Sequence, residues 1–335
     1  MKAFEIGEFG INNLALVERE MPQVSPGHVL VKMTAASLNY RDLMVVKGQY
    51  NPKMKRPIVP LSDGAGIVEE VGPDVTRFGK GDHVAGCFMQ KWIDGPITRE
   101  KSSSALGGAI DGVLQEYKLF SEEGLVPVPP SLSDEEAATL PCAGVTAWHA
   151  LFENVGSVPG SSVLIQGTGG VSVFALQFAK TAGLRTIVTS SSDEKLERVR
   201  SMGANETINY KRNPDWEREV RKLTDGVGVD QVVEVGGSNT LPRSLKAVRM
   251  GGAISVIGVL SGAAPNVTPA DMLMNSIRVQ GIYVGSRLMF ERLNRAIDLH
   301  VIKPVIDRTF AWTELKEALR YMEGQSHFSK ICLRF

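Results

Sequence analysis

Hydrophobic and polar positions alternate along much of the first third of the chain, and this pattern predicts short strands. The segment 28–39, HVLVKMTAASLN, combines the alternation with β-branched residues, and 64–72, GAGIVEEVG, has the length of a short strand before a turn. Glycines recur between Gly64 and Gly81, as expected of turns in an antiparallel barrel. The segment 88–112 is polar and rich in turn residues, so we expect a long surface loop there.

A different pattern begins near residue 131. Residues 131–152 have the spacing of a helix, with Ser133 as the expected N-cap and acidic residues in the first turn. From Ser162 onward, strand-like apolar runs alternate with helical stretches. The runs are 162–170, 184–192, 206–210, 229–237 and 252–262, and the first two helical stretches are 171–183 and 193–204. This alternation predicts a doubly wound parallel sheet of the α/β class, whereas 289–335, with two helical patterns and a final strand, can complete either domain.

Composition narrows the class of protein. The chain has 335 residues, a length typical of about two domains, and its 37 basic and 37 acidic residues cancel, which argues against nucleic acid as the main partner. The three cysteines, Cys87, Cys142 and Cys332, are too scattered for a disulfide framework or a structural zinc site. The N-terminus does not resemble a signal peptide, and no apolar run is long enough for a bilayer. We therefore expect a cytoplasmic protein without a membrane partner.

The most informative stretch is LIQGTGGVSVFALQFAK, residues 164–180, in which a strand runs into glycines and a helix follows at once. Glycines allow a tight turn and a close approach of the backbone to a pyrophosphate, which the helix N-terminus stabilises. Ser172 stands where the usual pattern has a third glycine, and we expect it to be tolerated with a slight displacement. A glycine turn alone is weak, but a complete βαβ unit around it favours dinucleotide binding. The predicted binding residues of this turn are Gly167, Thr168, Gly169, Gly170 and Val171.

The end of the second strand indicates which dinucleotide is bound. An NAD site usually has an acid there for the ribose 2′-OH, but this chain has Ser190 and Ser191, with Lys195 nearby. Small donors and a cation suit a 2′-phosphate, so we expect NADPH, with NADH the less favoured cofactor. Asp193 leaves an alternative open, because a small shift in register would make it the ribose acid; otherwise it lies in a helix turn capped by Ser192.

Several motifs in this order resemble those of the medium-chain dehydrogenase/reductase superfamily: SLNYRDL, GAGIVEEVG, GDHV, LPCAGVTAWHAL, the glycine turn and GGAISVIG. The resemblance covers nearly the whole chain. It implies a GroES-like β-barrel catalytic domain, residues 1–142 and 284–335, and a Rossmann dinucleotide-binding domain, residues 143–283. It also implies hydride transfer to or from a nicotinamide, in a cleft between the two domains.

The zinc enzymes of this superfamily bind their catalytic metal through a Cys, a His-Glu pair and a later Cys. In the matching positions this chain has Asn39, then Ser62 and Asp63, so that only Cys142 agrees. A catalytic zinc needs about three protein ligands, and the structural zinc lobe of the family needs four close cysteines, of which 85–120 has one. We therefore expect neither zinc site.

The sequence is similar to the zinc-free quinone-oxidoreductase-like branch, whose active site uses an Asn and tyrosines. Asn39 matches the Asn and Tyr50 one tyrosine, while the other tyrosine falls near Met44, where this chain departs from the branch. Tyr40 and Asp42 are possible substitutes. Tyr40 is equally well interpreted as a core aromatic, and Asp42 as an acid that fixes its loop.

These observations predict an NADPH-dependent reductase of quinones or α,β-unsaturated carbonyl compounds. Hydride addition to a conjugated acceptor spreads the charge, so a hydrogen-bond donor and a later proton can replace the Lewis acid that a simple ketone needs. Two alternatives stay open. One is a metal-free alcohol or aldehyde dehydrogenase, and the other is a non-catalytic NADPH-binding protein with a crystallin-like or sensor role.

The resemblance also implies further cofactor contacts and a homodimer. Tyr210 matches a tyrosine that lies against the 2′-phosphate, and Arg287 is a candidate for a phosphate or a substrate carboxylate. Residues 277–284 match the segment through which related dimers pair their sheets. The other implied cofactor residues are Thr146, Gly258, Val259, Leu260, Tyr283 and Val284.

Overall fold

The computed structural model describes residues 1–258 and 267–335, and within them the chain forms two compact units. The first unit combines both parts of the sequence that flank the second, Met1–Val145 and Val284–Phe335. The second unit is the continuous segment Thr146–Tyr283. None of the helices in the two described ranges has the length and apolar character needed to span a membrane.

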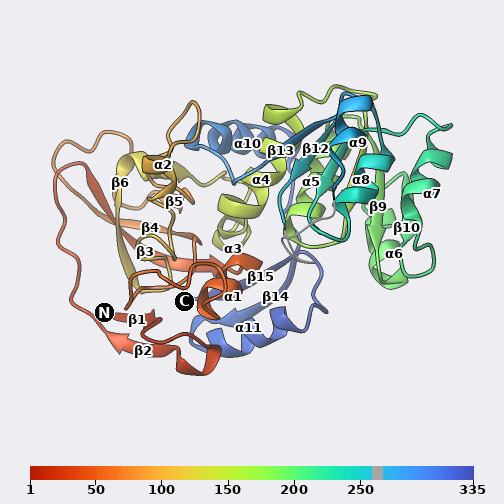
Figure 1. The fold of residues 1–335 in the computed structure, drawn as a ribbon. Coiled ribbons are helices and arrows are strands. Elements are labelled where there is room, and N and C mark those ends of the chain that lie inside the picture. The colour runs from red at the N-terminus through yellow and green to blue at the C-terminus, as the bar shows by residue number, and fades with distance from the viewer. Residues whose placement is uncertain (259–266) are drawn as a thin grey trace. The chain divides into compact units, whose positions relative to one another are not determined.

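The first unit is built on a mainly antiparallel sheet (Figure 1). Strand β15 pairs in parallel with β14 and antiparallel with β3, so a strand from the end of the sequence lies beside one from its beginning. The predicted strands at 28–39 and 64–72 are present as β3 and β4, and they pair with each other. In sheet order the strands are β14 (Ile306–Ala311), β15 (Lys330–Arg334), β3 (His28–Ser37), β4 (Asp63–Val71), β5 (His83–Gly86) and β7 (Leu125–Pro127), with β6 (Tyr117–Ser121) also on β3 and a separate pair β1 (Lys2–Glu5) and β2 (Ala15–Glu18).

The helical stretch predicted at 131–152 is present but divided. Ser133 caps α3 (Asp134–Ala138) through a capping box with Glu136, as the sequence predicts. After α3 the chain widens into π-helical turns, Leu140–Gly144 and His149–Asn154, on either side of α4 (Val145–Trp148). Pro141 has no N–H to donate, so a regular helix cannot continue through this point. The other helices of the first unit are α1 (Tyr40–Val46), α2 (Arg99–Ser102), α10 (Arg287–His300) and α11 (Leu315–Glu323), with the short 3₁₀ turns η1 (Ile11–Asn13), η2 (Glu122–Gly124) and η5 (Trp312–Glu314).

The expectation of a polar surface loop at 88–112 is confirmed for the exposed residues 94–100 but is wrong for the parts of the segment on either side of them. Phe88, Met89, Trp92 and Leu106 are buried, and Met89 forms an isolated β-bridge with Ala105. The backbone carbonyl of Trp92 also accepts a hydrogen bond from the N–H of Arg287, at 2.9 Å. Apolar side chains scattered among polar ones do not show a regular period, which is why the pattern did not predict their burial.

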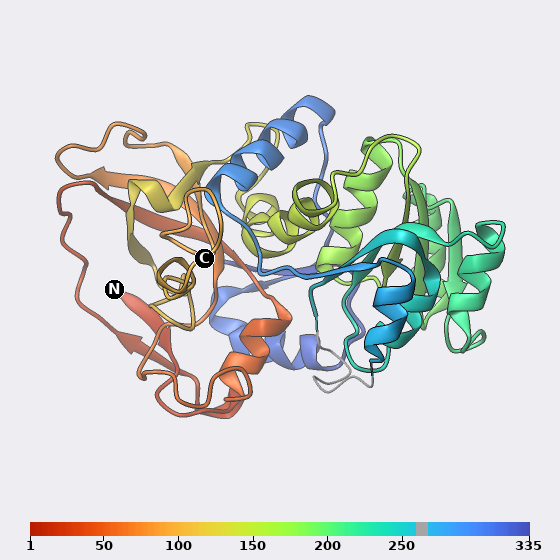
Figure 2. The ribbon, with the colours of Figure 1, turned by 45° about the horizontal axis from the view of Figure 1, so that its top comes forward.

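The second unit contains a six-stranded sheet, and every strand pair in it is parallel. Helices lie on both sides of this sheet (Figures 1 and 2), so the predicted doubly wound α/β architecture is confirmed. The strands, in sheet order, are β10 (Glu206–Asn209), β9 (Arg185–Ser190), β8 (Ser162–Gln166), β11 (Val229–Glu234), β12 (Val248–Val256) and β13 (Arg278–Gly281). The helices are α5 (Gly170–Thr181), α6 (Asp193–Ser201), α7 (Trp216–Leu223), α8 (Leu241–Ala247) and α9 (Pro269–Met274). All of α4 except Val145, and the π-helical turn that follows it, also belong to this unit.

Candidate active site

The glycine turn of the second unit has the geometry that a dinucleotide phosphate needs. Strand β8 ends before Gly167, whose φ of 73° is accessible to glycine at low cost. No heavy atom lies within 4 Å of a Cβ placed on Gly169, the N-cap of α5, so the backbone here is open to a ligand. The hydroxyl of Ser172, in the place of the third glycine, donates to the carbonyl of Gln166 at 2.7 Å. The turn therefore fits the pyrophosphate of a dinucleotide, with Thr168 buried in it and Val171 in the first turn of α5.

Sheet register places the residues expected at the ribose end next to one another. Ser190, the last residue of β9, lies opposite Asn209 of β10. The N–H of Tyr210 donates to the carbonyl of Ser190 at 3.1 Å, so Tyr210 begins the chain segment that runs beside Ser190 and Ser191. Lys195 is in the first turn of α6, and its backbone N–H donates to the hydroxyl of Ser192, the N-cap, at 3.3 Å.

The carboxylate of Asp193 has partners within the protein. It accepts a hydrogen bond from the side-chain amide of Asn209 at 2.8 Å and forms an ion pair with Arg212. Because this ion pair is exposed and therefore weak, the alternative in which Asp193 binds the ribose stays open. Sequence reasoning missed Arg212, the partner of Asp193, although the run NYKR, residues 209–212, contained the signal.

The remaining predicted cofactor residues are placed as follows. Thr146 is buried in α4, and Gly258 follows β12 with the carbonyl of Val235 only 2.3 Å from the position of a Cβ. Val259 and Leu260 lie outside the described residues. Tyr283 is exposed, whereas Val284 is buried with a φ of 56°. Arg287 forms ion pairs with Glu123 and Glu291, so its charge already has partners within the first unit. This disfavours its predicted contact with a phosphate or a substrate carboxylate.

In the first unit, the residues at the four zinc-ligand positions form one polar cluster together with Lys330, which we call the buried polar cluster; it consists of Asn39, Ser62, Asp63, the half-buried Cys142 and Lys330. The side-chain nitrogen of Asn39 donates to the hydroxyl of Ser62 at 3.4 Å, and that hydroxyl donates to Asp63 at 2.7 Å. The backbone N–H of Cys142 donates to the second oxygen of Asp63 at 3.0 Å. Lys330, from β15, donates to the side-chain oxygen of Asn39 at 2.7 Å. Sequence reasoning did not single out Lys330.

Burial sets the electrostatics of this cluster. It raises the pKa of the Asp63 carboxyl, while the positive charge of Lys330 is the largest opposing influence. Burial also raises the pKa of the neighbouring Asp42 to about 6, against the influence of Arg41. The carboxylate of Asp42 accepts the backbone N–H of Asn39 at 2.9 Å, which completes the capping box of α1. Asp42 therefore fixes the residue that begins this helix, which supports its interpretation as a loop-fixing acid.

The two predicted tyrosines both reach the surface of the first unit. Tyr40 is 38% exposed, so its interpretation as a core aromatic is wrong. Tyr50 is exposed to a similar extent, and its ring lies 5.1 Å from the guanidinium of Arg41. Arg41 also packs on the ring of Phe88 at 5.0 Å and donates to the carbonyl of Leu106 at 2.7 Å. Arg41 thus joins Tyr50 to the 88–112 segment.

The residues of the buried polar cluster do not fit a catalytic zinc ion. Asn39 and Ser62 are weak ligands, and burial raises the pKa of the Cys142 thiol, which disfavours the thiolate that zinc binds. The ammonium group of Lys330 would repel a divalent cation. Cys87, in the region of the family's structural zinc lobe, is buried with its pKa raised to about 12. No three metal-binding side chains of His, Cys, Asp or Glu come together in the two ranges that the structure describes.

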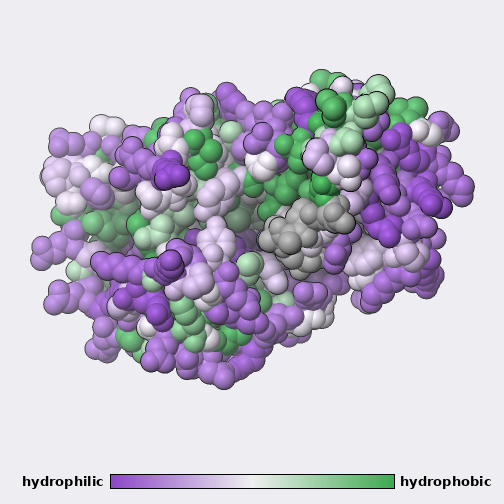
Figure 3. Space-filling model, in the orientation of Figure 1, coloured by the Kyte–Doolittle hydropathy of each residue, from purple (hydrophilic) through white to green (hydrophobic). Residues whose placement is uncertain are grey.

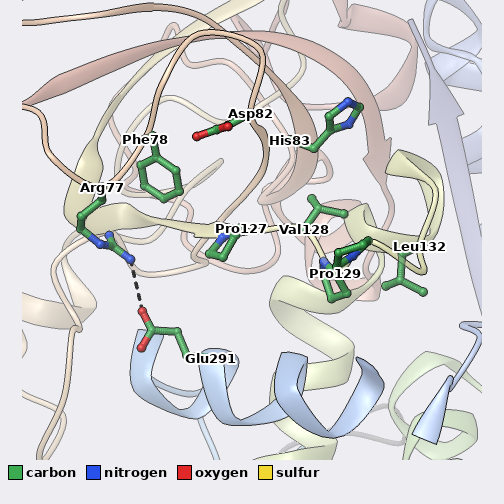
Figure 4. A pocket seen from close by; sticks show the side chains of 10 residues that line it. Arg77, Phe78, Asp82, His83, Pro127, Val128, Pro129, Leu132 and Glu291 are labelled. Carbon is green, nitrogen blue, oxygen red and sulfur yellow. Dashed lines mark hydrogen bonds and ion pairs between the residues drawn. The ribbon is translucent and has the colours of Figure 1, made fainter. Parts of the chain in front are cut away.

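A surface hollow of about 740 Å³ also lies in the first unit, and none of the predicted site residues lines it (Figure 4). Its wall combines the apolar side chains of Phe78, Val128 and Leu132 with three prolines. Arg77 and Glu291, which close one side, form an ion pair at 3.2 Å. Asp82 and His83 also line the hollow, and His83 is bonded to Asp134 at 2.8 Å. Because none of the predicted site residues lies here, the candidate chemistry remains with the glycine turn and the buried polar cluster.

Comparison with known proteins gives consistent matches along the chain. A family model described as "Alcohol dehydrogenase GroES-like domain" matches residues 25–130, and one described as "Zinc-binding dehydrogenase" matches residues 170–300. A zinc-type alcohol dehydrogenase-like protein of Schizosaccharomyces pombe is 48% identical over 97% of this chain and 96% of its own length. A quinone oxidoreductase of Rattus norvegicus is 27% identical over 95% and 92%, and a 2-haloacrylate reductase of a Burkholderia species is 29% identical over 97% and 96%.

Solved structures agree with this picture. A putative alcohol dehydrogenase from Sinorhizobium meliloti 1021 superposes with a TM-score of 0.94 at 42% identity, covering 100% of this chain and 98% of that chain. A protein named as an NAD-dependent alcohol dehydrogenase superposes with a TM-score of 0.91 at 33% identity, covering 100% of both chains.

Proposed function

Because the chain belongs to the medium-chain dehydrogenase/reductase superfamily, a family of oxidoreductases, we propose that it transfers hydride from NADPH to a quinone or an α,β-unsaturated carbonyl compound without a metal ion. The observation that carries the proposal is the exchange of the zinc ligands for the bonded chain Lys330–Asn39–Ser62–Asp63. The names of the rat quinone oxidoreductase and the Burkholderia 2-haloacrylate reductase support the same class of acceptor.

The proposed chemistry matches what these residues can supply. NADPH, when bound, provides the hydride, which adds to the β-carbon of the acceptor while the π electrons move onto the carbonyl oxygen and a proton from solvent completes the product. The side-chain amide of Asn39 is a hydrogen-bond donor suited to that oxygen, where negative charge develops. Tyr40 and Tyr50 are exposed hydroxyl groups in the same unit and are candidates to pass the proton.

The preference for NADPH rests on the ribose end of the nucleotide site. Ser190, Ser191, Lys195 and Tyr210 supply donors and a cation, and Asp193 forms an ion pair with Arg212. A 2′-phosphate bonds well to such groups, whereas a free carboxylate would repel it. One structural neighbour is named as an NAD-dependent enzyme, which favours NAD, so the cofactor needs a direct comparison.

A second candidate function is alcohol or aldehyde oxidation with the same cofactor. The observation that favours it is the naming of several relatives as alcohol dehydrogenases, among them a Geobacillus stearothermophilus protein that is 33% identical over 86% of this chain. The buried polar cluster is less suited to this reaction, because an alkoxide without a Lewis acid needs a strong base nearby.

One assay separates the two functions. Purified protein is mixed with NADPH and a panel of quinones and enones, and with NADP⁺ or NAD⁺ and simple alcohols, while nicotinamide absorbance is followed. We expect turnover with conjugated acceptors, at a rate that prolonged treatment with a zinc chelator does not change. Metal analysis should find less than roughly one tightly bound metal ion per ten chains, a background level for a site without its ligands. Alcohol oxidation that the chelator abolishes would reverse the assignment, and NADPH binding without turnover of any substrate would favour the non-catalytic alternative.

A further inference from the structure

Lys330 is a buried lysine with a defined set of acceptors. Its side chain belongs to β15 and the residue is only 2% exposed. The ammonium group donates to the backbone carbonyl of Leu38 and to the side-chain oxygen of Asn39, both at 2.7 Å. A lysine is seldom buried unless it is paired, because removing its charge from water is costly. The contact with Asn39, 291 positions away in sequence, is therefore part of what makes the burial possible.

This contact fixes the orientation of the Asn39 amide. An ammonium group has donors only, so the atom that faces Lys330 must be the amide oxygen. The amide nitrogen then faces the other side, toward Ser62 and Asp63, where it meets acceptors. Without Lys330 both orientations of the amide would be accessible, and one of them presents oxygen where the other presents N–H.

The amide is held unequally at its two ends. The oxygen bonds to Lys330 at 2.7 Å, a short charge-assisted distance, whereas the nitrogen bonds to Ser62 at 3.4 Å, near the limit for a hydrogen bond. Asn39 is also 9% exposed, while Ser62 and Asp63 are fully buried. The N–H end is thus the part of the cluster that can most easily exchange its partner for a ligand. A cation on the oxygen also makes the N–H groups of the amide stronger donors.

Resting on the proposed function, we propose that Lys330 is a positioning residue that holds and polarises the amide of Asn39, so that Asn39 donates an N–H to the carbonyl oxygen of the acceptor during hydride transfer. Lys330 itself does not contact the acceptor. The bond from Asn39 strengthens as the hydride arrives, because negative charge then collects on the oxygen. Loss of Lys330 is consequently expected to lower kcat more than it raises the KM for the acceptor.

The test compares Lys330→Met with Lys118→Met as a matched control. Lys118 is also buried in the first unit and donates to a backbone carbonyl, that of Asp111, at 2.8 Å, but it does not contact Asn39 in the described contacts. For Lys330→Met we expect kcat with a quinone or enone to fall by about tenfold or more, the lower range for loss of one donor to a developing oxyanion. The dissociation constant of NADPH, measured by fluorescence, should stay within about twofold, since the glycine turn is untouched. Lys118→Met should keep kcat within about twofold even where its melting temperature falls.

Asn39→Asp keeps the size of the side chain and the bond to Lys330 but replaces the donor by oxygen, so it also decides the question where Lys330→Met does not fold. We expect a loss of kcat at least as large as that of Lys330→Met. The double variant should show no further loss, because both changes remove the hydrogen bond from Asn39 to the carbonyl oxygen of the acceptor. A kcat within about twofold of the wild-type value in either single variant, or losses that multiply in the double variant, would overturn the inference. Failure of the wild-type protein to reduce any conjugated acceptor would instead refute the proposed function, so the two failures are distinguishable.

Discussion

Ser190 is the residue on which the choice between NADPH and NADH most directly depends. Ser190→Asp places a carboxylate at the end of β9, where it would repel a 2′-phosphate and accept the ribose hydroxyls of NADH. We expect kcat/KM for NADPH to fall by about tenfold or more, an effect of roughly 1.4 kcal/mol, and that for NADH to rise. Steady-state kinetics with both cofactors provide the measurement.

The control for this prediction is Ser103→Asp, which adds the same charge at an exposed position of the first unit. It should leave the ratio of the two cofactor efficiencies unchanged. A Ser190→Asp enzyme with the wild-type ratio would show that the 2′-position is bound elsewhere.

Asp42 predicts a pH dependence of stability. Burial raises its pKa from 3.8 in an unfolded chain to about 6, so between these values the folded protein holds a proton that the unfolded chain has lost. Asp42 therefore contributes about 3 kcal/mol to the free energy of unfolding below about pH 4. This contribution is lost as the pH rises through about 6. Asp42→Asn retains an acceptor for the N–H of Asn39 but does not titrate in this range.

Denaturant unfolding of both proteins at about pH 4.5 and about pH 7 measures this effect. We expect the variant to gain stability relative to the wild type as the pH rises, since all other carboxyl groups titrate in both proteins. If the free energies of unfolding of the wild type and of Asp42→Asn changed in parallel with pH, the pKa of Asp42 would not be raised by burial.

Single residues also show where sequence reasoning ends. Asn39, Ser62 and Cys142 could be identified because a motif marks each position, and the structure brings them together through Asp63. Lys330 could not, because it lies in a strand whose neighbours are apolar and its acceptors come from the opposite end of the sequence. A buried charge is determined by its partner, and a local pattern does not contain that partner.

Among the elements, β13 presents an exposed edge. It pairs with β12 on one side and ends the six-stranded sheet, and all of its residues are exposed. Exposed apolar side chains lie on α9 and near the start of β12, and Figure 3 shows apolar surface over this part of the second unit; they include Met250, Leu273 and Met274. An open strand edge beside apolar surface favours pairing with another copy. This supports the expected homodimer.

Val279→Asp tests the dimer, because a charge in the centre of β13 opposes the pairing of two such edges. We expect the wild-type protein to have the mass of a dimer by size-exclusion chromatography with light scattering, and the variant that of a monomer. Val227→Asp, at a more exposed valine of the same unit, should remain dimeric. A monomeric wild type, or a Val279→Asp dimer, would contradict the assignment of β13 as the interface.

Regular elements were predictable where the pattern is local. The strands and helices from Ser162 onward each have their own period, and the structure confirms their presence as β8 to β12 with α5 and α6. The predicted run 252–262 is confirmed only as far as Val256, and its residues 259–262 lie outside the described residues. Strand β14 was missed because its side chains are largely exposed and its stability comes from pairing with β15. The π-helical turns around α4 were missed for a related reason, since the pattern of apolar positions does not distinguish them from an α-helix.

For the molecule as a whole, the two units differ in how the sequence builds them. The second unit is one continuous segment with its own core, whereas the first needs residues from both sides of it. We therefore expect the fragment 146–283 to fold alone and to bind NADPH, which circular dichroism melting and nicotinamide fluorescence can measure. A fragment without a cooperative melting transition would show that the second unit depends on the first.

Strand β15, which carries Lys330 and lies between β14 and β3, has a consequence for biosynthesis. While the ribosome is still translating residues 146–329, the amino-terminal strands have already emerged, and β6 can pair with the first half of β3. Residues 35–37 of β3, however, still lack the partner that β15 supplies. The second unit can mature during translation, yet the sheet of the first unit stays incomplete until β15 has been made. Nascent chains stalled before residue 330 should therefore be the ones that chaperones retain, and enzymatic competence should arrive with the last strand to be made.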